Sequence, residues 1–73
     1  MAQKRSILVA GHRTSISLEE EFWSELLRIK TERQISINRL ITVIDQQRTT
    51  NLSSAIRLFV LAEIKAKAAS DNC

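Results

Sequence analysis

The chain has 73 residues, of which 44% are hydrophobic, and it carries a formal net charge of +3. A chain of this length forms one domain and buries only about 60% of its unfolded surface, so its core needs a disulfide, a metal or oligomerisation for support. The single cysteine, Cys73, and the single histidine, His12, allow neither an internal disulfide nor a four-ligand zinc site. We therefore expect oligomerisation, and we expect no metal and no cofactor.

The positive charge is concentrated near the N-terminus. Residues 1–18 contain three basic residues and no acidic one, whereas residues 19–73 contain eight of each. Such a local basic patch is typical of nucleic-acid-binding proteins, although a solubilising tail has the same composition. No apolar run approaches the roughly 18 residues that span a bilayer, and the N-terminus lacks the apolar segment of a signal peptide. These features predict a cytoplasmic protein.

The first predicted element is a strand. Residues 13–18 read RTSISL, and this alternation of polar and apolar side chains indicates a strand whose apolar face, Thr14, Ile16 and Leu18, packs on helices. Residues 6–9 are a candidate second strand, which Ala10 and Gly11 would join to the first in a tight hairpin. The alternative for residues 1–11 is a basic arm.

The next elements have the period of helices. Phe22, Leu26 and Ile29 predict an amphipathic helix of about four turns, with acidic residues in its first turn that suit the helix dipole. Ser36 is a suitable N-cap for a second helix that ends near residues 47–48.

A third helix is predicted over residues 52–68. Asn51 or Ser53 would cap it. It is apolar nearly all round, so we expect part of its surface to meet a second protomer. The last residues, 69–73, should fray.

The predicted strand needs a partner, because its backbone N–H and C=O groups must be satisfied. Two arrangements achieve this. Residues 7–9 of the same chain pair with it, or the same strand of a second chain does. The second arrangement gives a two-stranded antiparallel ribbon on an intertwined helical dimer.

These segments resemble the ribbon-helix-helix family of DNA-binding proteins. RTSISLEEEFWSELLRI is similar to the family's strand and first helix, and ISINRLITVI to its turn and second helix, which sets a domain at residues 12–48. GHRTSISLEEEFW, taken with NLSSAIRLFVL, is similar to a group of small alphaproteobacterial members. The resemblance implies a mainly α fold with one β-strand, assembled as a ribbon-helix-helix dimer. To this fold we expect the chain to add a C-terminal helix. The candidate strand at residues 6–9 would be an extra N-terminal strand.

The resemblance implies a sequence-specific transcriptional regulator, a repressor, that inserts its ribbon into the major groove of double-stranded DNA. The implied base contacts are Arg13, Ser15 and Ser17. Arginine can bond guanine with two hydrogen bonds, and a serine hydroxyl can donate to or accept from either kind of base. The alternative is a solvated polar strand face.

The resemblance also implies a phosphate clamp at the start of the second helix, where free N–H groups and the helix dipole favour anions. The expected phosphate contacts are Lys4, Arg5, His12, Ser36, Ile37, Asn38 and Arg39. An ordinary N-cap at Ser36 and a merely solvent-exposed His12 are the simpler interpretations. The family often has glycine in the turn between the helices, where this chain has Gln34, and a left-handed conformation is costly for that residue.

Two other functions stay open. In an antitoxin the same fold binds DNA while a C-terminal segment masks a toxin, but such tails are usually disordered until bound, whereas residues 52–67 indicate a folded helix. The other is a dimerisation module without a DNA role. No catalytic Ser/His/Asp set or P-loop is present, so we do not expect an enzyme. The expected partners are DNA, a second copy with higher-order assembly on DNA, and a protein bound through the C-terminal helix. Nucleoid association follows from DNA binding.

Overall fold

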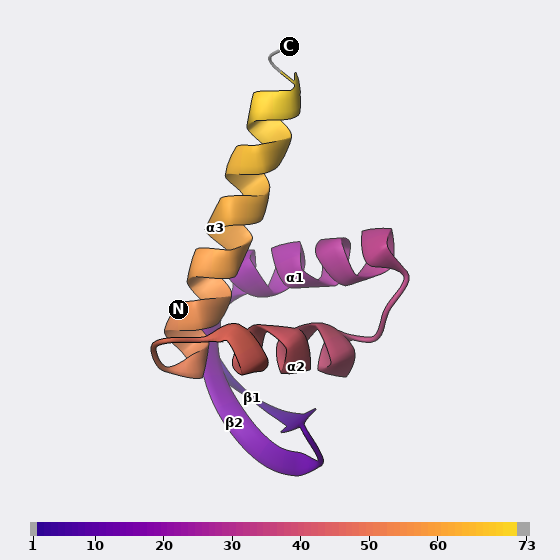
Figure 1. Cartoon of the computed structure of the whole chain (residues 1–73). Coiled ribbons are helices and arrows are strands. Elements are labelled where there is room, and N and C mark those ends of the chain that lie inside the picture. Colours follow the sequence, from indigo (N-terminus) through magenta and orange to yellow (C-terminus); the bar gives the residue numbers. More distant parts are fainter. Residues whose placement is uncertain (1, 72–73) are drawn as a thin grey trace.

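The computed structural model describes residues 2–71, and it describes side-chain burial for residues 3–69. The elements in chain order are β1 (Ala2–Val9), β2 (His12–Glu19), α1 (Glu20–Arg33), α2 (Ile37–Gln47) and α3 (Leu52–Asp71). Helices α1 and α2 lie side by side, α3 crosses them, and the hairpin of β1 and β2 lies at the opposite end from the C-terminal end of α3 (Figure 1).

The strands β1 and β2 pair as an antiparallel hairpin within one chain, with Val9 opposite His12 and Ala2 opposite Glu19. The two turn residues, Ala10 and Gly11, have φ values of 51° and 82°. Positive φ at both positions is what a two-residue type I′ turn requires. Of the two expected partners for the strand at residues 13–18, the structure has the one in the same chain. Strand β1 begins at Ala2, earlier than the candidate strand at residues 6–9, because residues 2–5 continue the ladder opposite residues 16–19 of β2.

The helix ends follow from local hydrogen bonds. Ser36 Oγ accepts a bond from the N–H of Arg39 at 3.0 Å, which confirms the predicted N-cap of α2. Asn51 Oδ1 accepts from the N–H of Ser54 at 2.9 Å and caps α3. Gln34 ends α1 in the left-handed conformation, with φ 57° and ψ 43°. The residue that replaces the expected glycine therefore adopts the conformation that glycine favours.

Helix α3 continues past the predicted end at residue 68. Residues 69–71 remain helical, whereas we expected them to fray, and residues 72–73 lie outside the described part of the chain. Of the described helices, none has both the length and the apolar character that crossing a membrane requires.

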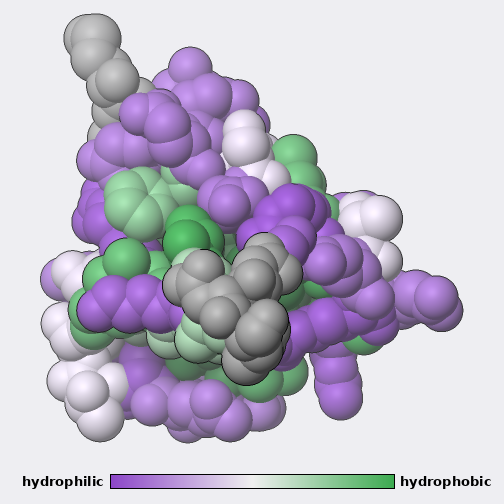
Figure 2. All heavy atoms as spheres, turned by 90° about the horizontal axis from the view of Figure 1, so that it is seen from above, coloured by the Kyte–Doolittle hydropathy of each residue, from purple (hydrophilic) through white to green (hydrophobic). Residues whose placement is uncertain are grey.

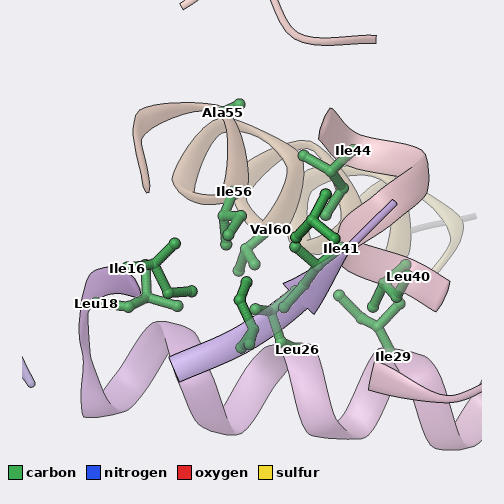
Figure 3. Packing of buried hydrophobic residues seen from close by; sticks show 12 residues of the cluster. Ile16, Leu18, Leu26, Ile29, Leu40, Ile41, Ile44, Ala55, Ile56 and Val60 are labelled. Carbon is green, nitrogen blue, oxygen red and sulfur yellow. The ribbon is translucent and has the colours of Figure 1, made fainter. Parts of the chain in front are cut away.

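A hydrophobic core lies between the hairpin and the helices. It contains 12 buried hydrophobic residues, and among the described residues no polar or charged side chain is buried. Side chains from β2 and all three helices converge in it (Figure 3). Six side chains are less than 2% exposed: Leu18, Leu26, Leu40, Ile41, Ile56 and Val60. Each such burial contributes roughly 1.5–3 kcal/mol, so packing of the helices on the strands is the main stabilising term.

An apolar surface remains on α3. Leu58 is 61% exposed and Leu61 is 45% exposed, and the two share one side of the helix because they are three residues apart. Seen from above, apolar side chains interrupt the otherwise mostly hydrophilic surface (Figure 2). The hairpin pairs β2 within the chain along one of its two edges. The exposed α3 surface is a separate apolar feature that favours a second protomer.

Candidate nucleic-acid interface

The predicted base-contacting residues lie together on one face of the hairpin. Arg13, Ser15 and Ser17 of β2 are exposed, whereas Ile16 and Leu18 between and beyond them are 3% and 0% exposed. Successive side chains of a strand point to opposite faces, so the apolar set packs on the helices and the polar set points away from them. The structure therefore places these three residues as the strand period predicts.

Strand β1 contributes further side chains to this face. The sequence alone did not place these side chains there together. The register sets Lys4 opposite Ser17, Ser6 opposite Ser15 and Leu8 opposite Arg13. Residues directly opposite each other in a ladder share a face. We call this set the outer face: Lys4, Ser6, Leu8, Arg13, Ser15 and Ser17, all exposed. The alternation of residues 4, 6 and 8 with the more buried residues 5, 7 and 9 is the signal that would have found them.

Basic residues of the outer face and of the start of α2 have no acidic partner. Within the part of the chain that the structure describes, Lys4, Arg13 and Arg39 form no ion pair. The five other arginines are all paired: Arg5, Arg28, Arg33, Arg48 and Arg57. Three of the unpaired cations in the described part of the chain therefore lie on the outer face and at the start of α2, where they would attract phosphate. The other unpaired cations there are lysines of α1 and α3: Lys30, Lys65 and Lys67.

Arg5 does not join the outer face. Its guanidinium bonds the carboxylate of Glu20 at 3.0 Å and lies 4.5 Å from the ring centre of Trp23. The guanidinium covers the ring of Trp23, which is half-buried against the core. Through these contacts Arg5 joins β1 to α1, and its expected contact with phosphate stays a prediction.

The start of α2 adjoins the outer edge of β1. Asn38 Oδ1 accepts a long hydrogen bond, 3.5 Å, from the backbone N–H of Leu8. Of the four residues expected at the clamp, three are exposed and Ile37 is half-buried, so Ile37 can offer an anion only its backbone N–H. A hollow of about 260 Å³ separates the helix start from the outer face, and its lining includes Arg13 and Asn38. The clamp residues and the ribbon thus border one surface, as phosphate contacts beside a major-groove ribbon must.

His12 lies elsewhere. It is exposed next to the hairpin turn, opposite Val9, and its side chain is on the face that turns away from Arg13. It borders a separate hollow that Asp45 and Arg48 also line. The structure does not bring it together with the other expected phosphate contacts.

The end of β2 carries an acidic residue, Glu19, whose charge is compensated. Arg57 Nε donates to Glu19 Oε1 at 2.7 Å. This hydrogen bond is the main reason that the pKa of Glu19 lies below its ordinary value. The carboxylate is thus paired by α3 and repels an approaching phosphate less than a free one would.

The described residues contain no group of three or more His, Cys, Asp or Glu side chains arranged to hold a metal ion. Comparison with protein families found a match to a ribbon-helix-helix domain over residues 2–64. The match includes β1, which the sequence analysis placed outside its domain at residues 12–48. No curated protein and no solved structure matched the chain.

Proposed function

The chain belongs to the ribbon-helix-helix family, a DNA-binding regulatory fold that is not usually enzymatic, and we propose that it is a sequence-specific transcriptional repressor. The observation that carries this proposal is the outer face, where unpaired Lys4 and Arg13 stand among serine hydroxyls on a two-stranded ribbon. A ribbon of this width fits the major groove of B-DNA.

The proposed mechanism separates positioning from base recognition. Arg39 and the N–H groups at the start of α2 bond phosphates and fix the orientation of the protein on the duplex. Arg13 then bonds O6 and N7 of a guanine, while Ser15 and Ser17 bond neighbouring base edges. Because the ribbon is held on the core by Ile16 and Leu18, these side chains are presented on a rigid support.

Salt dependence tests the electrostatic part of this proposal. Binding to a random duplex, followed by fluorescence anisotropy, should weaken with salt at a slope of about −4 to −7 if a dimer neutralises roughly 4–8 phosphates. Arg39→Gln should weaken binding to all duplexes alike and make the slope smaller by about 1 per chain. Lys65→Gln, which removes an exposed charge from α3, is the control and should leave the slope unchanged. A slope near zero for the wild type would refute DNA binding through phosphates.

We further infer that the protein acts as a homodimer that associates through the α3 surface of Leu58 and Leu61. Both side chains are apolar, and Leu58 lines a hollow of about 270 Å³ together with the half-buried Phe59. Leu58→Glu should give a monomer by sedimentation, whereas Leu27→Glu, at an exposed leucine of α1, should leave the dimer intact. A wild-type chain that sediments as a monomer, with a melting temperature independent of concentration, would contradict the dimer.

An antitoxin is the second candidate function, because the same α3 surface offers a docking site for a toxin. Helix α3 is folded through Asp71 in the isolated chain, unlike a tail that orders only on binding, and this favours the regulator. A small protein that co-purifies from the native host with the wild type but not with Leu58→Glu would favour the antitoxin.

A further inference from the structure

Leu8 is the one large apolar side chain of the outer face. It is 48% exposed, whereas its neighbours Ile7 and Val9 are each 7% exposed and belong to the core. The other outer-face residues are basic or carry hydroxyl groups. Leu8 therefore contributes little to the core, and its exposed side chain is available to contact an apolar group of a ligand.

The hairpin fixes Leu8 beside Arg13. The N–H of Leu8 points to Asn38 and away from β2, so Leu8 and Arg13 form a non-hydrogen-bonded pair. In such a pair the Cα atoms are about 4.5 Å apart and the side chains are close. Both residues, together with Ser6, line the hollow in front of α2. Leu8 and Arg13 therefore present their side chains to the same part of a ligand surface.

Among the base edges of the major groove, only thymine presents an apolar group, its C5 methyl, while guanine presents the acceptor pair that suits arginine. We propose that Leu8 contacts the methyl group of a thymine next to the guanine bound by Arg13. The inference rests on the proposed DNA-binding function and deepens it. It makes β1 part of the reading surface and makes one chain the source of both strands of the ribbon.

The test removes only the methyl group. A duplex selected by the wild-type protein from a randomised pool is remade with deoxyuridine in place of each thymine in turn. At one position the change should weaken wild-type binding about fourfold, the effect of one buried methyl-sized group. Leu8→Ala should bind the thymine and uracil duplexes equally. Leu27→Ala, at an exposed leucine far from the hairpin in sequence, should keep the wild-type preference.

Two results would overturn the inference. Either the wild type is indifferent to deoxyuridine at every position, or Leu8→Ala keeps the fourfold preference. Either result can be told apart from failure of the proposed DNA-binding function, because in that case the randomised pool would yield no preferred sequence at all. If Arg13→Ala loses specificity while Leu8→Ala does not, the DNA-binding proposal stands and only the role of Leu8 is lost.

A crosslink tests whether one chain supplies both strands. Ser6 and Ser15 are directly opposite each other, two positions along from Leu8 and Arg13, so they too form a non-hydrogen-bonded pair whose spacing suits a disulfide. The variant Ser6→Cys/Ser15→Cys/Cys73→Ser should oxidise to a crosslinked monomer on a non-reducing gel. A crosslinked dimer would show that the ribbon is shared between chains and would overturn this part of the inference.

Discussion

Arg57 on α3 holds the carboxylate of Glu19 at the end of β2 through two hydrogen bonds, of 2.7 Å from Nε and 3.1 Å from Nη2. Nη2 also reaches the backbone carbonyl of Ser17 at 3.3 Å. A two-pronged arginine–carboxylate pair is geometrically specific as well as favourable. The C-terminal helix is thereby joined to the ribbon itself, next to one of the proposed base-contacting residues.

The pair of Arg57 and Glu19 should make the free energy of unfolding depend on pH in the acidic range. The hydrogen bond from Arg57 lowers the pKa of Glu19 from its ordinary 4.5 in the folded chain. The pair therefore stabilises the fold above the ordinary pKa, and the stabilisation is lost as the pH falls through the lowered one. Between about pH 5 and pH 3 the free energy of unfolding should fall more steeply for the wild type than for Glu19→Gln. Urea denaturation across this range measures it, and Arg57→Gln should flatten the dependence similarly. Parallel curves for all three proteins would show that the pair contributes nothing.

The two faces of β2 should differ sharply in their effect on stability. Ile16 is 3% exposed among the helices, so Ile16→Ala should cost about 2–5 kcal/mol. Ile16→Ser should cost at least as much, because it also buries a hydroxyl group. Ser15→Ala, one position away on the outer face, should change stability by no more than about 0.5 kcal/mol. Chemical denaturation gives these values, and equal costs at the two positions would mean that the faces are assigned wrongly.

The turn between α1 and α2 offers a stabilising substitution. Gln34 has φ 57° and ψ 43°, and a left-handed conformation costs a residue with a Cβ about 1–2 kcal/mol. Gln34→Gly should therefore stabilise the fold by about 1 kcal/mol. Gln46→Gly, inside α2, is the control and should destabilise it by a similar amount. If Gln34→Gly also destabilises the protein, the turn does not have the conformation described.

Several elements could be predicted because short-range chemistry determines them. The outward direction of Arg13 follows from alternation with Ile16 and Leu18, and the start of α2 follows from the side chain of Ser36. In both cases the residue and its immediate neighbours contain the whole explanation. The left-handed conformation of Gln34 had no such local signal, because only the family's frequent glycine at that position pointed to it and glutamine there is a departure from the family.

The partner of β2 could not be predicted in this way. Backbone pairing is nearly independent of side-chain identity, so residues 7–9 and a second copy of β2 satisfied the same N–H groups equally well. The place of Arg5 could not be predicted for a related reason, since a positive charge does not say which face of a strand it occupies, and only the register reveals its place above Trp23. The contact between Arg57 and Glu19 joins distant segments and has no local signal.

The central claim is that the outer face of the hairpin recognises DNA sequence, and the most direct test is the specificity ratio of Arg13→Ala. Affinities for the selected duplex and for a random duplex are measured by anisotropy, with a thermal melt of each protein. Arg13→Ala should lose about 1–3 kcal/mol of binding per site, with relaxed specificity at one base position. Its stability should stay within about 0.5 kcal/mol of the wild type. If Arg13→Ala instead keeps the wild-type ratio between the two duplexes, the hairpin is not the surface that recognises sequence.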